Sequence, residues 1–240
     1  MNELPTICIL AGGRGRRLGP RVTDVPKPLL EVGGEPFLFH QLRLLARHGA
    51  RHIVLCVGYL GERIRARIGP RQFGLTIEYS FDAPGLDGTL GAIRRARDLL
   101  GDRFLVLYGD TYLRLDYRTA ADEWRRSGCL GLMVVLRNDG QWDQSNTVYA
   151  NGRVIEHDKS TPTSPMRWID YGLGGLKAEA LDRVPASEGD LSSLYKRLAE
   201  LGELCGYETR ERFYEIGRPE SLAETDAFLR RVKASGPASR

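Results

Sequence analysis

The chain has 240 residues, enough for one large α/β domain with a substantial core and only marginally enough for two. Apolar residues make up 42 % and charged residues 28 % of it, which excludes a disordered or fibrous protein. The net charge of +4, with 35 Lys and Arg against 31 Asp and Glu, does not indicate an extended nucleic-acid surface. The apolar run at residues 6–11 is too short to cross a bilayer, and Glu3 does not suit a secretory signal. We therefore expect a cytoplasmic protein that binds neither membrane nor nucleic acid.

The first half of the chain alternates strands with helices. Residues 6–10 (TICIL) form an apolar run typical of a strand buried on both faces, and a glycine-rich segment follows directly. A helix is expected at residues 37–48 and a second buried strand at 52–57. Further helices are expected at 62–68, 92–100 and 117–126, and further strands at 76–80, 104–108 and 130–136. This alternation predicts an α/β fold with a doubly wound, mostly parallel sheet.

The second half predicts an antiparallel excursion from that sheet. Asn151 and Gly152 favour a type I′ turn, so residues 147–157 read as a hairpin. A loop at 160–165, a helix at 191–201, a strand at 212–216 and a helix at 221–231 complete the expected elements. We expect a single domain over residues 1–232 and a flexible tail at 233–240.

The glycine-rich segment at residues 11–19 predicts an anion site. A P-loop would need Gly-Lys followed by Ser or Thr, which the chain lacks. A dinucleotide-binding loop must open a helix directly, and Pro20, Pro26 and Pro28 prevent that. What remains is a loop whose backbone N–H groups can approach phosphates closely, followed by Arg17 and by Lys27 between two prolines.

This segment, LAGGRGRRLGPRVTDVPKPLLEVGGEPFL, resembles the signature of the sugar-1-phosphate nucleotidyltransferases (G-G-x-G-x-R-L, then P-K-P). The resemblance extends over nearly the whole chain and implies the Rossmann-like nucleotidyltransferase fold. It implies an enzyme that joins a nucleoside triphosphate to a sugar 1-phosphate with the help of Mg²⁺ and releases pyrophosphate. The pattern is most similar to the guanylyltransferases that act on heptose 1-phosphates, which favours GTP and a heptose 1-phosphate as substrates.

The same resemblance implies roles for individual residues. Arg17 would hold the leaving pyrophosphate, Lys27 would contact the α-phosphate, and Asp110 would bind the metal; these three are the expected catalytic residues. The residues implied in nucleotide binding are Leu10, Ala11, Gly12, Gly13, Gly15, Arg17, Lys27, Gly88, Thr89 and Gly109. Those implied in binding the sugar phosphate are Asn146, Asp158, Lys159, Asp170 and Gly172. Glu215 aligns with a second metal-binding position.

Four positions depart from the family pattern, namely Leu90, Asn146 in place of a glycine, Asp158 in place of a glutamate, and Glu215 in place of an aspartate. Some roles also have structural alternatives. Asp110 would cap a turn, Asp158 would form a surface ion pair, and Glu215 would pair with Arg212 or Arg218.

The reaction itself needs no general base, because a phosphate monoester with a second pKa near ~6 is already largely dianionic at neutral pH. The four histidines show no triad pattern and are expected mostly on the surfaces of helices, strands and turns. Three other functions stay open. One is a uridylyl- or thymidylyltransferase acting on another sugar 1-phosphate, and a second is a related transferase that uses a different acceptor, such as choline phosphate or a cyclitol phosphate. The third is a nucleotide-binding regulatory domain that has lost catalysis.

Overall fold

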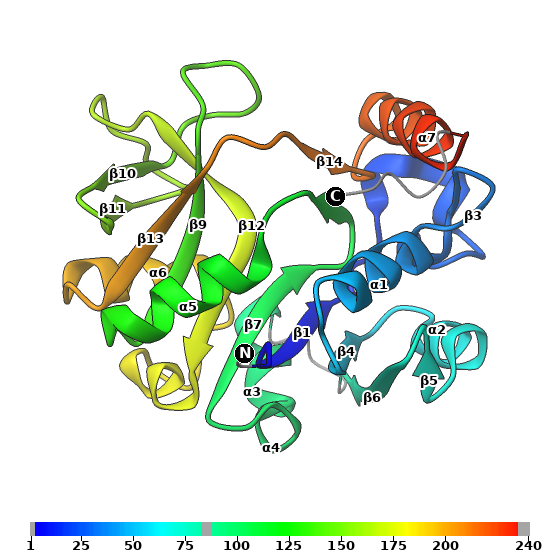
Figure 1. Ribbon diagram of the computed structural model, residues 1–240, viewed down its shortest axis with the longest axis horizontal. Coiled ribbons are helices and arrows are strands. Elements are labelled where there is room, and N and C mark those ends of the chain that lie inside the picture. Colours follow the sequence, from blue (N-terminus) through cyan, green and yellow to red (C-terminus); the bar gives the residue numbers. More distant parts are fainter. Residues whose placement is uncertain (1–2, 83–87, 235–240) are drawn as a thin grey trace.

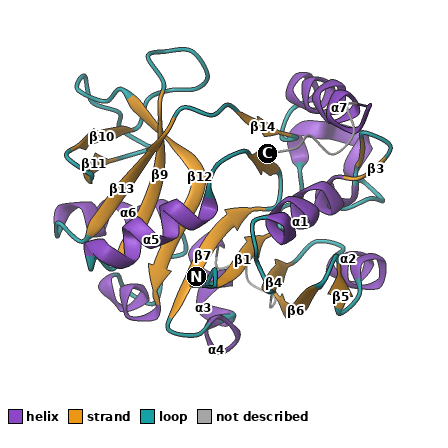
Figure 2. Ribbon diagram, in the orientation of Figure 1, coloured by secondary structure: helices purple, strands orange, loops and turns teal. Residues whose placement is uncertain are grey.

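A ten-stranded sheet runs through the molecule, in the order β10-β11-β13-β9-β12-β7-β1-β4-β6-β5 (Figures 1 and 2). The structure is a computed structural model that describes residues 3–82 and 88–234. The strands of the sheet are β1 (Thr6–Leu10), β4 (His52–Val57), β5 (Arg71–Gln72), β6 (Leu75–Phe81), β7 (Arg103–Tyr108), β9 (Gly131–Arg137), β10 (Thr147–Ala150), β11 (Arg153–His157), β12 (Trp168–Lys177) and β13 (Leu204–Thr209).

The centre of the sheet is parallel and its second half is mixed. Strands β6, β4, β1 and β7 are parallel neighbours, whereas β12 runs antiparallel to both β7 and β9. Beyond β12, strand β9 pairs in parallel with β13. The predicted α/β class, with a parallel core and an antiparallel excursion in the second half, is confirmed.

Helices cover both faces of this sheet. Alternate side chains of β1 point to opposite faces, so that Ile7 and Ile9 pack with α1 (Phe37–Arg47), α2 (Gly61–Ile68) and α5 (Tyr117–Ser127). Cys8 packs on the other face with α3 (Gly88–Arg95), α4 (Arg97–Leu100) and α6 (Leu191–Glu200). Because both faces are buried, the central strands are continuous apolar runs, as their sequence indicated.

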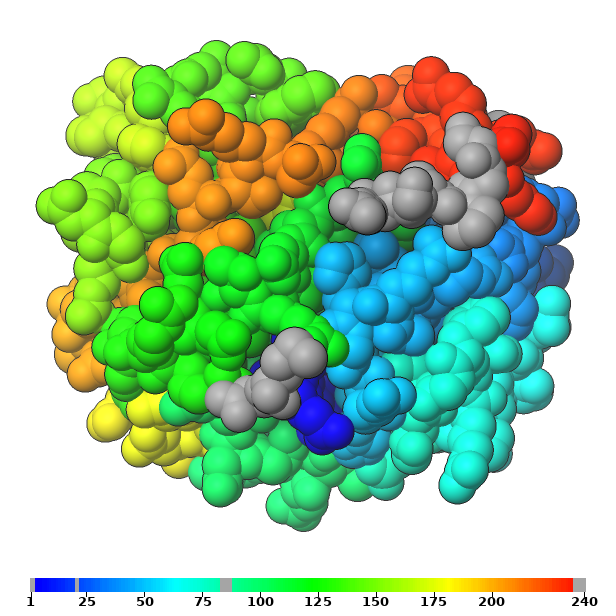
Figure 3. All heavy atoms as spheres, viewed as in Figure 1, coloured from blue at the N-terminus to red at the C-terminus, as the bar shows by residue number. Residues whose placement is uncertain are grey.

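A third apolar cluster joins the end of the chain to its beginning. Helix α7 (Pro219–Ala234) packs on the hairpin β2 (Glu31–Val32) and β3 (Glu35–Pro36), and on the two-stranded sheet of β8 (Thr111–Leu113) and β14 (Phe213–Glu215). The amide of Gly33 donates to Asp226 Oδ1 of α7 at 2.7 Å. The space-filling view shows the same adjacency, with red α7 beside the blue segment (Figure 3).

Most predicted elements are present within one to three residues of their expected ends. Both turn residues of the β10–β11 hairpin have positive φ, 51° at Asn151 and 74° at Gly152, which confirms the type I′ conformation. Helix α3 begins at Gly88, four positions before the expected start, and Ala96 separates it from α4. Helix α7 includes the first two residues of the expected tail, and residues 235–240 lie outside the described residues.

Two long strands were missed by the sequence analysis, and one was expected in the wrong sheet. Strands β12 and β13 contain interior glycines, which weaken strand patterns. The strand expected at 212–216 is the shorter β14, which pairs antiparallel with β8 outside the main sheet. Across the described ranges, no helix is both long and apolar enough to cross a membrane.

Replacing Gly175 with alanine should lower the free energy of unfolding by about 1–3 kcal/mol. The added methyl carbon would lie 2.7 Å from the ring of Trp124, a fully buried residue of α5. Urea denaturation measures the change. Gly13→Ala is the control, because no atom of the described part of the chain lies within 4 Å of its added Cβ, and the free energy of unfolding of this variant should change by less than about 0.5 kcal/mol. Wild-type stability for Gly175→Ala would show that the sheet can shift to admit the methyl group.

Candidate functional site

The glycine-rich loop leaves β1 at the carboxyl edge of the parallel sheet, where ligands of doubly wound proteins gather. Its first amide, from Ala11, donates to Cys56 O at the end of β4 at 2.8 Å. The loop then forms only short 3₁₀ turns, at Arg16–Val22 and Lys27–Leu29. The prolines thus prevent a regular α-helix here, as expected.

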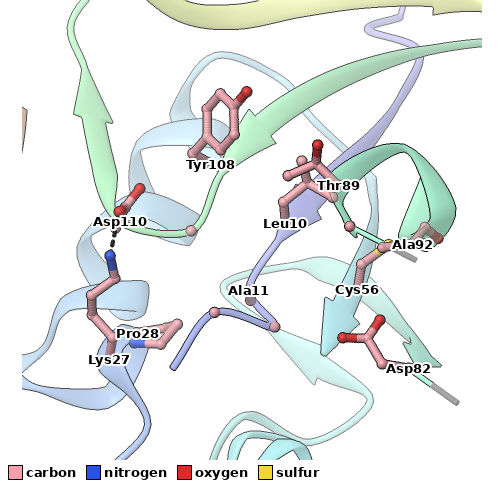
Figure 4. A pocket seen from close by; sticks show the side chains of 14 residues that line it. Leu10, Ala11, Lys27, Pro28, Cys56, Asp82, Thr89, Ala92, Tyr108 and Asp110 are labelled. Carbon is pink, nitrogen blue, oxygen red and sulfur yellow. Dashed lines mark hydrogen bonds and ion pairs between the residues drawn. The ribbon is translucent and has the colours of Figure 1, made fainter. Parts of the chain in front are cut away.

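An ion pair between Lys27 and Asp110 links this loop to the end of β7 (Figure 4). Both side chains are largely shielded, with exposed fractions of 15 % for Lys27 and 27 % for Asp110. Gly15 packs closely against the Lys27 side chain, because a Cβ at this position would lie 3.4 Å from it. The φ of Gly15 is 62°, a conformation that glycine adopts without strain. Loop and strand end are therefore held together by opposite charges.

A first cavity of about 280 Å³ opens beside this ion pair. It is lined by eight of the ten residues predicted to bind nucleotide, all except Gly15 and Arg17. Its lining is Leu10, Ala11, Gly12, Gly13, Lys27, Pro28, Cys56, Asp82, Gly88, Thr89, Ala92, Tyr108, Gly109 and Asp110. Figure 4 shows the loop and the end of β7 on one side of this space and Thr89 on the other.

Asp82 is a residue of this cavity that the sequence analysis missed. It follows β6 directly, and its amide donates to Val57 O at 2.8 Å. Its carboxylate lies against the glycine loop, because a Cβ added at Gly12 would be 2.7 Å, and one at Gly58 2.3 Å, from Asp82 Oδ2. Asp82 could have been predicted as a site residue because an aspartate follows a predicted strand there, as it does at Asp110.

Gly88 and Thr89 line the first cavity and are supported by contacts with Gly189 and Leu191. Gly88 has a φ of 65°, and a Cβ there would lie 2.4 Å from Gly189 O. The Thr89 hydroxyl oxygen accepts from the amide of Leu191 at 2.9 Å, at the start of α6. These two residues, which are predicted to bind nucleotide, are therefore positioned by the segment that leads into α6 and by its first residue.

A second, larger cavity of about 1040 Å³ meets the first at Tyr108 and Asp110. It brings together Arg17, Glu215 and four of the five residues predicted to bind the sugar phosphate. Its lining is Arg17, Tyr108, Asp110, Thr111, Trp142, Asp143, Gln144, Asn146, Lys159, Pro162, Ile169, Asp170, Tyr171, Gly172, Arg212, Phe213, Tyr214, Glu215, Arg218, Glu220, Ser221 and Glu224.

Lys159 and Asp170 form the central ion pair of the second cavity, with Nζ and Oδ2 2.9 Å apart. Asp170 is 3 % exposed, and its Oδ1 accepts from the amide of Gly172 at 3.0 Å. Burial would raise the pKa of Asp170, but the charge of Lys159, with His157 and these hydrogen bonds, lowers it below its usual range. The charge of Asp170, which outweighs the effect of burial, raises the pKa of Lys159. Both groups are therefore ionised at neutral pH.

Asp158, the fifth predicted sugar-phosphate residue, does not line either cavity. Its Oδ2 pairs with Lys196 of α6 at 2.7 Å, and its Oδ1 accepts from the amides of Ser160 and Thr161. The bond from Lys196, aided by Ser160, lowers the pKa of Asp158 well below its usual range. The surface ion pair considered as an alternative is thus present, with Lys196 as the cation, and Asp170 is the carboxylate beside Lys159.

Glu215 lies near Asp110, at one end of the two-stranded sheet of β8 and β14. It belongs to β14, whose pairing with β8 places Glu215 opposite Thr111. The amide of Ile216 donates to Asp110 O at 3.0 Å, and Glu215 Oε2 accepts from the amide of Gly217 at 2.9 Å. Arg212, a suggested partner of Glu215, pairs instead with Glu224. Within the described ranges, no group of three or more His, Cys, Asp or Glu side chains is arranged to hold a metal.

The expected surface positions were wrong for two histidines. His40 is 8 % exposed and its Nε2 lies 2.7 Å from Val32 O, and His157 is 1 % exposed. Burial lowers the pKa of both imidazoles, that of His157 to about 4. His48 and His52 are partly exposed. None of the four histidines lines either of these two cavities, so neither cavity offers a histidine as a catalytic base.

The fold is that of a doubly wound α/β protein whose main cavities open at the carboxyl ends of β1 and β7. The chain belongs to the nucleotidyl transferase family, whose pattern matches residues 7–143.

Individual proteins resemble a larger part of the chain. The mannose-1-phosphate guanylyltransferase catalytic subunit beta of Danio rerio is 28 % identical over 238 residues. The alignment covers 95 % of this chain, which spans 66 % of the length of that relative. The structure of HddC from Yersinia pseudotuberculosis in complex with GMP-PN superposes with a TM-score of 0.74 at 23 % identity, over 94 % of this chain and all of that one. UDP-glucose pyrophosphorylase of Acinetobacter baumannii gives a TM-score of 0.80 at 14 % identity, over 98 % and 95 % of the two chains.

Proposed function

We propose that the protein is a sugar-1-phosphate nucleotidyltransferase, which converts a nucleoside triphosphate and a sugar 1-phosphate to a nucleoside diphosphate sugar and pyrophosphate. The observation that carries the proposal is the ion pair of Lys27 and Asp110 where two cavities meet. One cavity offers a backbone cradle and the other offers Arg17 and Lys159. Two anionic substrates could thus bind side by side, with their reacting phosphates at the junction. Membership of the nucleotidyl transferase family supports this assignment.

The protein's own groups have defined tasks in this reaction. A phosphate oxygen of the sugar 1-phosphate forms a bond to the α-phosphorus, while the bond from that phosphorus to the leaving pyrophosphate breaks. The attacking oxygen is already ionised at neutral pH, so no base is required. Lys27 would neutralise charge at the α-phosphorus, Arg17 would hold the pyrophosphate, and Lys159 would hold the sugar phosphate. The fixed positions of these cations lower the cost of bringing two anions together.

The residues at the junction fit a magnesium ion. Mg²⁺ takes one or two carboxylates together with phosphate oxygens and water. Asp110 and Glu215 both line the second cavity, and the hydrogen bond from Ile216 to Asp110 O holds their segments side by side. When bound, the ion would supply positive charge to the triphosphate. Asp110 and Glu215 would hold it, and Lys27 would move its bond from Asp110 to the nucleotide.

We further propose that the nucleotide is GTP. Guanine presents two adjacent N–H donors on one edge, and the carboxylate of Asp82 at the wall of the first cavity accepts only. HddC, crystallised with GMP-PN, and the mannose-1-phosphate guanylyltransferase of Danio rerio support the same base. A heptose 1-phosphate remains the predicted sugar.

Pyrophosphate release from a panel of nucleoside triphosphates and sugar 1-phosphates tests the main proposal. Arg17→Ala and Lys27→Ala should each lower kcat by about 10²-fold or more, because each removes a donor that stabilises the transition state. Arg16→Ala is the matched control, since Arg16 lies in the same loop but lines neither cavity, and it should keep near-normal turnover. Nucleotide binding without turnover by the wild type would favour an inactive regulatory domain.

The metal assignment predicts different effects for its two carboxylates. Asp110→Asn should abolish metal-dependent turnover, because it removes the charged ligand at the junction. Glu215→Gln should raise the Mg²⁺ concentration needed for half-maximal activity and leave the maximal rate closer to that of the wild type. Titration of activity against Mg²⁺ measures both. An unchanged Mg²⁺ requirement in Glu215→Gln, with inactive Asp110→Asn, would indicate that Asp110 is the only carboxylate ligand.

The base assignment predicts a change of preference in Asp82→Asn. An amide offers one acceptor and one donor, so the variant should lose about tenfold or more in kcat/KM for GTP relative to UTP. Asp102→Asn, on an exposed residue outside both cavities, is the control. Steady-state kinetics with both nucleotides gives the ratio. A higher kcat/KM for UTP, dTTP or CTP than for GTP in the wild type would contradict the guanine proposal and favour the uridylyl- or thymidylyltransferase alternative.

A further inference from the structure

A chain of hydrogen bonds runs from α6 to the wall of the second cavity. Ser192 Oγ lies 3.1 Å from His157 Nε2, and His157 Nδ1 lies 3.0 Å from Thr147 Oγ1. Thr147 Oγ1 in turn lies 3.0 Å from Oδ1 of Asn146, which lines the cavity. Thr147 and His157 are almost completely buried, with exposed fractions of 0 % and 1 %. The side chains of Ser192, His157 and Thr147 have no role in the proposed transfer reaction.

The amide of Asp170 and the neutral ring of His157 determine which group donates in each of these hydrogen bonds. The amide of Asp170 can only donate, and it lies 3.1 Å from an Asn146 side-chain atom, which identifies that atom as the oxygen. Thr147 must donate to the same oxygen, so its own oxygen accepts from His157 Nδ1. Burial lowers the pKa of His157 to about 4, and the neutral ring leaves Nε2 as an acceptor for the Ser192 hydroxyl.

Asn146 is consequently held in one orientation. Its Oδ1 accepts from two donors, whereas its Nδ2 has, among the described residues, one long contact, to Gln144 O at 3.4 Å. The group that it offers to a ligand in the cavity is therefore an N–H donor. The carboxylate of Asp170, which lines the same cavity, is an acceptor. A sugar hydroxyl both accepts and donates, so it can satisfy the two side chains together.

We propose that Asn146 is a sugar-specificity residue that donates from Nδ2 to a hydroxyl of the sugar 1-phosphate, and that His157 is the positioning residue that fixes its orientation. The proposal rests on the proposed function. It identifies the acceptor substrate as a sugar that keeps a free hydroxyl at the contacted position, and it predicts discrimination against the corresponding deoxy sugar. Glycine at this position would lack both the donor and the buried chain that orients it.

The test of Asn146 combines variants with singly deoxygenated substrates. Mannose, glucose and heptose 1-phosphates are compared first, and the deoxy analogues of the best of them are then assayed with wild type, Asn146→Gly and Asn146→Asp. One deoxy analogue should lose about tenfold or more in kcat/KM with the wild type and much less with Asn146→Gly. Asn146→Asp should raise the KM for the sugar 1-phosphate by about tenfold and leave the KM for the nucleotide unchanged.

The test of His157 uses two variants of similar shape. Asparagine can place an amide N–H where Nδ1 donates, whereas leucine cannot donate. His157→Asn should therefore keep the sugar KM near that of the wild type, and His157→Leu should raise it by about fivefold without changing the nucleotide KM. Should His157→Leu fail to fold, Thr147→Val interrupts the same chain isosterically and should give the same rise.

The possible outcomes separate this inference from the proposed function. An active wild type whose loss with every deoxy analogue is the same in Asn146→Gly overturns the specificity role alone. Equal sugar KM values in folded His157→Asn and His157→Leu, or an unchanged KM in Thr147→Val, overturn the positioning role. A wild type that releases no pyrophosphate with any pair of substrates overturns the proposed function, and the inference with it.

Discussion

The ion pair between Lys27 and Asp110 is the contact around which the rest of the site is arranged. It joins the loop after β1 to the end of β7, two segments that neighbouring parallel strands bring to the same edge of the sheet. Partial shielding from water strengthens such a pair, and the packing of Gly15 against the lysine stem restricts where the cation can go. The proline-containing loop forms only short 3₁₀ turns, and hydrogen bonds from Tyr59 to Thr23 O and from Arg63 to Asp24 O also restrain it. Asp110 lines both cavities, and Lys27 lines the first.

Strand β12 joins the parallel part of the sheet, which carries the glycine loop, to the mixed part, which carries the residues of the second cavity. It lies between β7 and β9 and runs antiparallel to both, and strands β9, β13, β11 and β10 extend the sheet beyond it, away from the glycine loop. The carboxylate of Asp170 enters the second cavity from this strand, and Lys159 reaches it from the loop after β11. Asp170 lies within the sheet and Lys159 lies two residues beyond the end of β11, so the sheet positions the backbone of one charge and the start of the loop that carries the other. Because the Asp170 side chain is almost completely buried, water screens its charge from Lys159 only weakly.

The sequence was most informative where chemistry is local. The loop from Gly12 to Lys27 and the position of Asp110 after an apolar strand could be predicted because neighbouring residues determine both. Strand β12 was missed because its glycines, which accommodate Trp124 and Tyr195, resemble a loop signal. The partner of Asp158 depends on Lys196, 38 positions away, and no local pattern indicates such a contact. The buried state of His157 likewise depends on tertiary packing, since its strand position alone allowed either face.

The position of helix α6 limits how the substrate specificity of such a protein can change. Its first residues hold the wall of the first cavity through Thr89 and the hydrogen-bond chain to Asn146 through Ser192, while Lys196 further along secures Asp158. One rigid element thus carries supports for both cavities. A homologous helix transplanted by recombination would disturb two pockets at once unless residues 88–95 and the β10–β11 hairpin were exchanged with it. Divergence towards new substrates is therefore expected to proceed by correlated substitutions across these three segments rather than by independent changes in each pocket.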